Sequence, residues 1–444
     1  MKLFATAARR RRGVLALGLA AGLVAVASGC SNSAAVSDKT SGVTINVVES
    51  AEAPPKAMLD QFTKQTGITV KWTNVDWDSL QTKITAAATA KTYFADVTDV
   101  DWSRVGQFAK LGWFYDMSDY VDVDKLKADL PQLNSFTADG KVVGLPGDAM
   151  FMVTTVNTKM FAEAGITKMP TTIDEYTQDL KTVKAKGVVQ YPLNIPFAAA
   201  EGLSTYWYET TGAFGGSVLT DKDEPAFTSP DSAGYKAAEW MIQAVKDGLV
   251  SPGEINTTDS QGQQNLMATG KVASTFSDYA GNVGTLYNVK DTSTVTGQVK
   301  YIPTPTSGGE PKNLDNPDGM GIPVTAKYPK AAAKFIEWYT SAAVQEKFAG
   351  LGSADQLYST FSLPAHLTAV EALANGDKLD QGATLKQMFQ NSTAPIFPGG
   401  APTWYSSLSK AVYTNLHAAA AGSETADQAI KKIASTAKQL ASGS

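Results

Sequence analysis

The stretch VTINVVESAEAPPKAMLDQFTKQTGITVKW, residues 43–72, decides the fold class. Its first six residues are rich in β-branched side chains, which predicts a buried strand over 43–48. The proline pair at 54–55 can open a helix, because proline is tolerated in the first helical turn, and Gly67 is a stop signal. ITVKW (68–72) predicts the next strand. A strand, a helix and a second strand in such close succession are typical of a parallel sheet.

The same alternation continues along the chain, with a helix predicted over 80–90, a strand over 96–100 and a helix over 104–111. Thr172 and Glu175 match a capping box at the start of another helix. The fold class is therefore predicted as α/β, with mainly parallel sheets and helices on both faces. Further helices are expected at 172–186, 232–246, 261–268, 330–339, 343–349, 406–420 and 424–441, and a strand at 272–276.

The N-terminal segment has the composition of an export signal. Five basic residues lie within the first twelve, residues 13–29 carry no charge, and Cys30, the single cysteine, follows. Ala-Ser-Gly-Cys resembles the bacterial lipobox, which implies a signal peptide over 1–29, lipidation of Cys30 and a flexible tether over 30–42. An uncleaved membrane anchor is the alternative. Both interpretations place the rest of the chain outside the cytoplasm, on the outer face of the cell membrane.

Composition narrows the function further. Five of the 38 basic residues and none of the 43 acidic ones lie in the first 29, so the remainder has an excess of ten acidic side chains. This charge does not suit a nucleic-acid partner. A remainder of about 415 residues predicts about two domains. With two distant histidines, His366 and His417, neither a zinc site nor a histidine-based triad is supported. We expect no metal and no cofactor.

Five segments follow one another along the chain at 95–121, 140–166, 227–253, 270–281 and 328–341. Their order resembles that of the extracellular solute-binding proteins of ATP-driven importers, in the branch that binds sugars. GKVVGLPGDAMFMVTTVNTKMFAEAGI (140–166) is similar to the family's Gly-Leu-Pro turn, strand and following helix, and GKVASTFSDYAG (270–281) to the strand before a ligand-facing turn.

The resemblance implies a type II periplasmic-binding-protein-like fold, in which two lobes close around a ligand. Its implied boundaries are 43–147 with 302–342 for the first lobe, and 150–300 with 344–444 for the second. Chain crossings are expected near 146–150, 301–305 and 340–344. The implied protein is a monomer and not an enzyme, and it delivers a mono- or oligosaccharide to a membrane permease.

Polar or aromatic residues follow several predicted strands, where ligands bind in open α/β sheets. Sugar hydroxyls suit carboxylates and amides, and sugar C–H faces suit aromatic rings. Asp278 and Tyr279 lie where the resemblance puts a ligand turn, and Trp404 where it puts a stacking aromatic. Each residue also has a purely structural interpretation; Asp101, for example, could cap a helix. The candidate ligand-binding residues are Glu49, Trp77, Asp101, Trp102, Asp148, Trp207, Asp278, Tyr279, Gly319 and Trp404.

Two other function classes stay open at this point. The same fold could bind a polyamine, a peptide, a metal or a phosphate-containing ligand, and Asp99, Asp101 and Asp278 could supply acids for a polyamine. An exported glycoside-acting enzyme would need two carboxylates at a fixed separation. The sequence has no Gly-x-Ser-x-Gly, His-Glu-x-x-His or P-loop motif to support an enzyme.

Overall fold

The computed structural model describes residues 36–290, 292–308, 314–349, 363–376, 378–379, 381–391 and 396–443. The predicted signal peptide, Cys30 and the first residues of the predicted tether lie outside the described residues. All the described residues belong to one compact unit, which spans residues 35–444.

The strands of this unit form two main sheets and one small hairpin sheet. The strands are β1 (Val43–Glu49), β2 (Ile68–Asn74), β3 (Val97–Asp101), β4 (Thr137–Ala138), β5 (Lys141–Val142), β6 (Leu145–Pro146), β7 (Met152–Asn157), β8 (Leu193–Asn194), β9 (Ser274–Tyr279), β10 (Val299–Ile302) and β11 (Asp318–Gly321).

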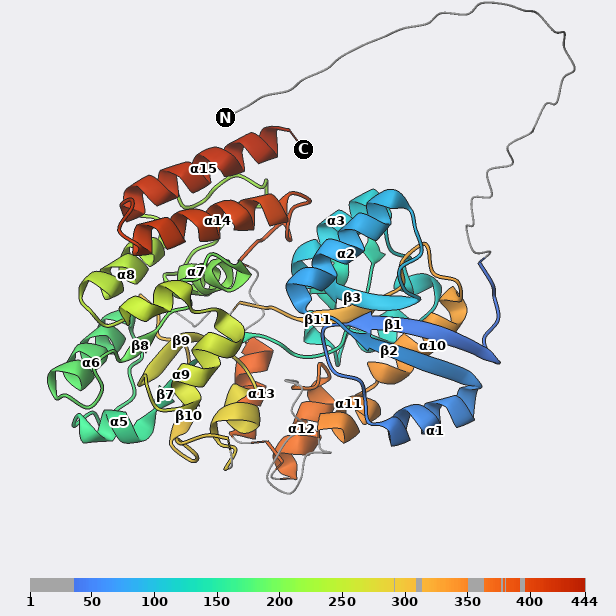
Figure 1. Ribbon diagram of the computed structural model, residues 1–444, viewed down its shortest axis with the longest axis horizontal. Helices are drawn as coiled ribbons and strands as arrows, with labels where there is room; N and C mark the ends of the chain where they lie inside the picture. The colour runs from blue at the N-terminus through green and yellow to red at the C-terminus, as the bar shows by residue number, and fades with distance from the viewer. Residues whose placement is uncertain are drawn as a thin grey trace, which may run out of the picture. The chain divides into compact units, whose positions relative to one another are not determined.

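Helices lie between the strands, as the predicted alternation requires, and two long helices end the chain (Figure 1). The helices are α1 (Lys56–Thr66), α2 (Trp77–Ala90), α3 (Val105–Leu111), α4 (Val123–Leu126), α5 (Thr158–Glu163), α6 (Ile173–Ala185), α7 (Glu201–Ala213), α8 (Ala233–Lys246), α9 (Gln264–Ala268), α10 (Pro329–Tyr339), α11 (Ala342–Ala349), α12 (Leu367–Asn375), α13 (Gly382–Asn391), α14 (Tyr405–Ala420) and α15 (Ala426–Ser442).

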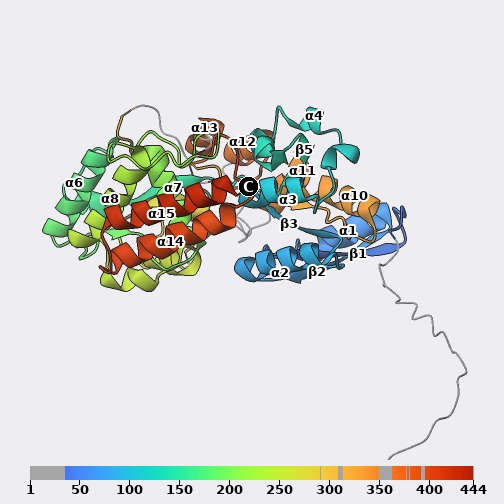
Figure 2. The ribbon, with the colours of Figure 1, turned by 90° about the horizontal axis from the view of Figure 1, so that it is seen from above.

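The first sheet has the strand order β2-β1-β3-β11-β6. β1 pairs in parallel with β2 and with β3, while β11 runs antiparallel to both of its neighbours. Alternate side chains of β1 point to opposite faces. Ile45 and Val47 share a hydrophobic cluster with α1 and α10, and Val48 shares another with α2 and α3. Helices therefore cover both faces: α2 and α3 lie on one side of the sheet and α1 and α10 on the other in Figure 1, and Figure 2 shows the same elements from above.

The second sheet has the strand order β10-β7-β9-β8. Here β7 runs antiparallel to β9 and β10, and β8 is parallel to β9. Val156 and Phe276 contribute to a core with α6, α7, α8, α14 and α15, and Val153 faces a second core with α9, α12 and α13. Each main sheet thus contains one reversed strand, β11 or β7, among strands of a common direction. The predicted α/β class is confirmed, but the sheets are mixed rather than mainly parallel, because β11 and β7 pair antiparallel with both of their neighbours.

Several local predictions are confirmed and others are corrected. Gly67 has a positive φ of 73° and ends α1, and Thr172 and Glu175 form the predicted capping box. The helix predicted over 80–90 begins earlier, at Trp77, because the side chain of Asp76 accepts a hydrogen bond from Ser79 N and caps it. The strand predicted at 272–276 is β9, which lies two to three residues further along. Residues 318–321, which have the glycine-rich composition of a turn and include the candidate Gly319, form strand β11 instead.

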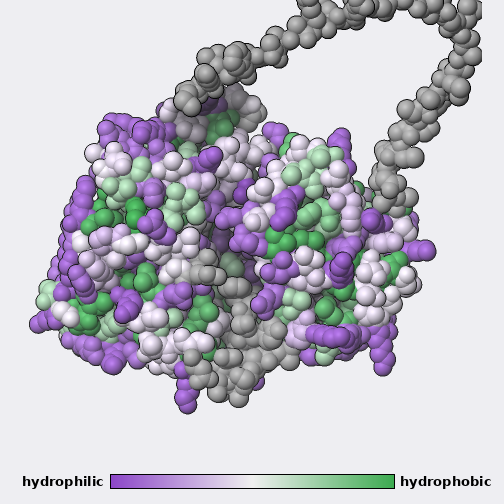
Figure 3. Space-filling view, viewed as in Figure 1, coloured by the Kyte–Doolittle hydropathy of each residue, from purple (hydrophilic) through white to green (hydrophobic). Residues whose placement is uncertain are grey.

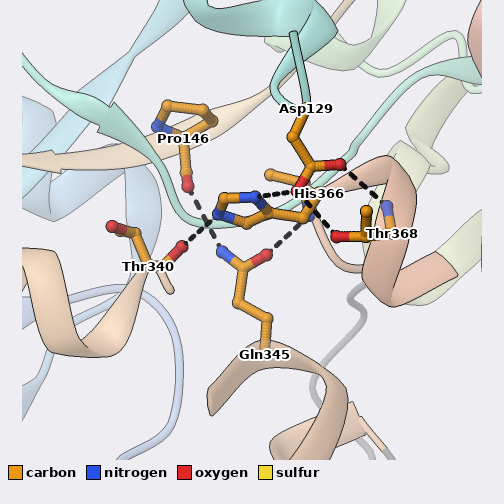
Figure 4. Close-up of polar contacts among 7 residues, drawn as sticks. Asp129, Pro146, Thr340, Gln345, His366 and Thr368 are labelled. Atoms are coloured by element: carbon orange, nitrogen blue, oxygen red, sulfur yellow. Dashed lines mark hydrogen bonds and ion pairs between the residues drawn. The ribbon is translucent and has the colours of Figure 1, made fainter. Parts of the chain in front are cut away.

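A buried polar network joins distant segments beside the first passage of the chain from one sheet to the other (Figure 4). Gln345 Nε2 donates to the carbonyls of Pro146 and Gly147, at 3.3 and 3.0 Å, and Gln345 Oε1 accepts from Ala365 N. His366 Nδ1 lies 2.8 Å from Asp129 Oδ2, and its Nε2 lies 2.7 Å from the carbonyl oxygen of Thr340. The network therefore fixes α11 and the start of α12 against the end of β6.

Both ring nitrogens of His366 face groups that accept hydrogen bonds. These groups are the carboxylate of Asp129 and the backbone carbonyl of Thr340. Burial raises the pKa of Asp129, but hydrogen bonds from Thr368 and His366 outweigh this, so the pKa is lowered overall. The contact between His366 and Asp129 therefore joins two segments of the fold that are distant in sequence.

No helix in the described part of the chain is both long and apolar enough to cross a membrane.

Candidate functional site

Five carboxyl groups gather where the central strands of the first sheet end. Parallel strands β1 and β3 place Glu49 and Asp101 at the same edge, since their carboxyl ends coincide. Strand β11 enters in the opposite direction, with Asp318 in register with Asp101 and Met320 with Asp99. Asp148 follows β6, and its Oδ1 accepts a hydrogen bond from Asp318 N at 3.2 Å. We call Glu49, Asp99, Asp101, Asp148 and Asp318 the acidic group.

Some carboxyl oxygens of the acidic group accept hydrogen bonds from other residues, and other oxygens have no hydrogen-bond donor. Asp101 Oδ1 accepts from the backbone N–H of Ser103 at 2.8 Å and from its hydroxyl, so it caps the turn after β3 as one interpretation of the sequence expected. Asp99 Oδ2 accepts from the amide of Gln81. By contrast, Glu49 Oε1, Asp99 Oδ1 and Asp318 Oδ1 are buried oxygens without a hydrogen-bond partner among the described residues.

Burial and mutual repulsion raise the pKa values of this group. Burial, followed by the charges of neighbouring acids, raises the pKa of Glu49, Asp99 and Asp318. Burial also raises the pKa of Asp148, to about 7. The charges of Asp99, Asp101 and Asp148 each contribute to the raised pKa of Asp318. The site is therefore built to hold protons or another positive charge close to neutral pH.

Arg104 lies in the turn directly after β3. Its positive charge partly offsets the rise in the pKa of Asp99. Its guanidinium carbon lies 5.9 Å from the ring centre of Trp77 and 6.0 Å from that of Tyr405. Its Nε is buried and has no hydrogen-bond partner in the described part of the chain. A basic group and two aromatic rings therefore accompany the carboxyls.

Residues of the second half of the chain approach the same place. Tyr405 donates to Glu201 Oε1 at 2.6 Å, and the charge of Asp101 contributes to the raised pKa of each of these two residues. Tyr279, on β9, donates to Asp259 Oδ2 at 2.5 Å, and the charge of Asp318 contributes to its raised pKa. The acidic group thus faces side chains from α7, β9 and α14. The surface in Figure 3 is hollowed near its middle, and hydrophilic residues border the hollow.

The structure brings six of the predicted site residues to this region. Trp102 follows Asp101 directly, donates from Nε1 to Asn316 Oδ1 at 2.6 Å and packs against Phe397 and Tyr405. Its ring belongs to the core of the second sheet, although its backbone directly follows β3 of the first sheet. The six residues are Glu49, Trp77, Asp101, Trp102, Asp148 and Tyr279.

The other four predicted residues are engaged in packing. Trp207 is 0 % exposed and donates to the carbonyl of Gly234 at 2.8 Å, and Trp404 is buried in the same core. Gly319 lies inside β11, where a Cβ atom would come within 2.4 Å of the Leu145 carbonyl oxygen. Asp278 is 1 % exposed, and its two oxygens accept hydrogen bonds from four donors of the protein.

Six residues of the site were not among the predicted ligand-binding candidates, although Asp99 was considered for a polyamine: Asp99, Arg104, Glu201, Asp259, Asp318 and Tyr405. Arg104 could have been suspected, because it closely follows the strand-end acids Asp99 and Asp101. No local signal marks Glu201 or Asp259, whose partners Tyr405 and Tyr279 are distant in sequence.

Among the described residues, no three His, Cys, Asp or Glu side chains converge so as to hold a metal ion.

A family model described as bacterial extracellular solute-binding protein matches residues 47–346, which is more than half of the chain. The chain belongs to this family. The match covers the end of β1 and all the later strands of both main sheets, so it includes every member of the acidic group. Family membership indicates an extracytoplasmic location.

One curated relative of this solute-binding protein is the diacetylchitobiose binding protein DasA of Streptomyces coelicolor. The two are 28 % identical over 291 residues, which are 60 % of this chain and 63 % of the relative. The match thus spans less than two thirds of the relative's length.

Solved structures of similar fold cover the chain more completely. The maltose-bound MalE3 of T. maritima has a TM-score of 0.76 and 21 % sequence identity. The matched region is 90 % of this chain and 100 % of the MalE3 chain. A solute-binding protein of Agrobacterium radiobacter K84 in complex with ribitol has a TM-score of 0.78 and 22 % sequence identity. The matched region is 90 % of this chain and 99 % of that protein's chain. The expected type II periplasmic-binding-protein fold is confirmed.

Proposed function

We propose that this solute-binding protein binds a mono- or oligosaccharide between its two sheets and delivers it to the permease of an ATP-driven importer, without catalysing a reaction. One observation supports the proposal most: the acidic group lies near the aromatic side chains of Trp77, Tyr279 and Tyr405, at the carboxyl ends of β1 and β3. Carboxylates accept hydrogen bonds from sugar hydroxyls, and aromatic rings cover sugar C–H faces. The names of the relatives, which include sugar and polyol complexes, support the same ligand class.

The two sheets correspond to two proposed lobes, 43–147 with 302–342 and 150–300 with 344–444. The chain passes from β6 to β7 near Gly147, from β10 to β11 after Ile302, and from α10 to α11 near Thr340. These three passages are the proposed hinge. A ligand that contacts both lobes favours the closed state, because it binds that state more tightly. The closed form would then dock, as a monomer, on the permease.

Titration calorimetry of the protein without its first 29 residues tests the ligand class. A panel of maltose, N,N′-diacetylchitobiose, ribitol and spermidine should give binding to a sugar or polyol and no turnover of it. Replacing Trp77 with alanine should weaken that binding by about 1–3 kcal/mol if the ring contacts the ligand. Tight binding of spermidine alone would favour the polyamine alternative, and release of a cleaved sugar would favour the glycoside-acting enzyme.

We also propose that lipid on Cys30 holds the protein at the outer face of the cell membrane. The lipobox-like Ala-Ser-Gly-Cys and the polar segment after it support this. One acyl chain gives only marginal membrane binding, so more than one chain is expected. Cys30→Ser should move the protein from the membrane fraction to the soluble fraction, while Ser31→Ala, its control, should not. Continued membrane association of Cys30→Ser would instead favour the uncleaved anchor.

A further inference from the structure

A tryptophan of the first proposed lobe lies in the core of the second. Trp102 directly follows β3, and its ring centre lies 5.8 Å from that of Phe397 and 5.5 Å from that of Tyr405. Among the described residues, it is the only member of that core that precedes β7 in the chain. Its indole N–H donates to Asn316, in the passage from β10 to β11. The aromatic rings that pack against Trp102 therefore belong to the other lobe.

Four residues further along, the backbones of the two lobes come very close. Gly106 lies in α3, and a Cβ atom at this position would lie 2.4 Å from the carbonyl oxygen of Ala401. A side chain does not tolerate that distance, so any residue larger than glycine would push the two segments apart. Figure 1 shows the start of α14, which follows Ala401 in the chain, close to α3. The contact between the two segments therefore requires glycine.

Arg104, between these two positions, also reaches across the lobes. Its guanidinium carbon lies 6.0 Å from the ring centre of Tyr405, whose hydroxyl donates to Glu201. Its charge partly offsets the rise that burial causes in the pKa of Glu201. Apolar, steric and charged contacts thus join residues 102–106 to residues 397–405. We call the two segments together the interlobe contact.

We propose that the interlobe contact stabilises the closed state before any ligand binds, so that Trp102 and Gly106 raise ligand affinity without touching the ligand. This inference rests on the proposed function, because it concerns closure of the two proposed lobes. Separating the lobes here withdraws the Trp102 ring from Phe397 and Tyr405 and exposes apolar surface, which costs free energy. A larger closed population in the free protein increases the apparent affinity in proportion. Trp102 and Gly106 are therefore positioning residues.

Gly106→Ala tests the inference, because it adds one methyl group at the interlobe contact and removes no polar group. X-ray scattering from the ligand-free protein, without its first 29 residues, should show a larger radius of gyration for this variant than for the parent. The midpoint of thermal unfolding should change little, because opening relieves the clash and alanine favours the helix. Gly443→Ala is the matched control: the nearest atom to its Cβ would lie 3.7 Å away, and the radius of gyration should stay the same.

Ligand kinetics give a second measurement that a purely structural role would not affect. The ligand is the tightest binder among maltose, N,N′-diacetylchitobiose and ribitol. In Gly106→Ala it should dissociate about tenfold faster, while the association rate stays the same because ligand enters the open form. Stopped-flow mixing measures both rates. Gly443→Ala should change neither of them.

Trp102→Ala removes the aromatic part of the contact instead of adding bulk to it. It should also increase the radius of gyration of the ligand-free protein and speed dissociation about tenfold, because two aromatic pairs across the lobes are lost. Trp240→Ala is its control. Trp240 packs against Tyr176 and Phe276 in the same core, away from the interlobe contact. Its loss should lower the midpoint of unfolding without changing the radius of gyration.

The outcomes separate this inference from the proposed function. A parent protein with the same radius of gyration as Gly106→Ala and Trp102→Ala would overturn the inference and leave sugar binding intact. Tighter ligand binding by Trp102→Ala would show that the ring holds the lobes apart, and would overturn it as well. Failure of every sugar and polyol to bind, with the expected scattering differences present, would overturn the proposed function and support the interlobe contact.

Discussion

Raising the pH from about 5 to about 8 should lower the free energy of unfolding of the ligand-free protein. Burial raises the pKa of Glu49, Asp99 and Asp318, and it raises the pKa of Asp148 to about 7. In the unfolded chain these groups titrate near pH 4. Between the unfolded-state and folded-state pKa values, the folded state binds more protons than the unfolded state. The contribution of these four groups to stability is therefore complete below about pH 4 and is lost as the pH rises through the folded-state pKa values.

The slope should be about 1.4 kcal/mol per pH unit for each proton that the folded state retains. Thermal or urea unfolding across this pH range measures it. Asp148→Asn is the matched variant, because the amide oxygen can still accept from Asp318 N while the titrating group is gone. It should be more stable than the parent protein at pH 8 and show a shallower slope. A parent protein whose stability is constant or increases across this range would contradict the assignment.

Replacing Asp278 with alanine should destabilise the protein by about 3–5 kcal/mol, because it leaves several buried donors without an acceptor. The carboxylate accepts from the Thr155 hydroxyl, the Asn282 amide, the Tyr287 hydroxyl and the Tyr279 backbone N–H, at 2.7 to 2.9 Å. These contacts tie the end of β9 to β7 and to the residues that come after β9. Asp278→Asn keeps one acceptor oxygen and should lose less stability.

This experiment also decides between the two interpretations of Asp278. If its role is structural, the alanine variant shows a large fall in its midpoint of unfolding, while ligand affinity measured well below that midpoint changes little. If Asp278 contacts the ligand, as the sequence suggested, affinity falls with little change in stability. The structure favours the first outcome, because the protein itself supplies all four donors.

Local signals in the sequence predicted much of the fold. The strand at 43–48, the helix that Gly67 ends and the capping box at Thr172 depend on residues that lie close together in sequence. Strand β11 could not be recognised in the same way. Asp318-Gly319-Met320-Gly321 has the composition of a turn, and it becomes a strand because β3 and β6, both distant in sequence, form the gap it fills.

The candidate site was predictable to the extent that it depends on where strands end. Glu49, Asp101 and Asp148 follow strands, and the structure brings them together. Trp207 shows the limit of such reasoning. An aromatic run on a helix predicts one buried face, but α7 is enclosed by α8, α14 and β9, so nearly its whole surface is buried. Sequence patterns do not show how many neighbours surround a helix.

The position of β11 has a consequence for how the protein is made. Because β11 lies between β3 and β6, the first sheet is completed by residues 318–321, long after its other strands have been synthesised. Until then β3 and β6 each expose an unpaired edge, a state that favours aggregation. A chain emerging from the ribosome would therefore depend on a chaperone, or on remaining unfolded, until about three quarters of it exists. The interleaved order of strands therefore makes completion of the first sheet a late event in synthesis.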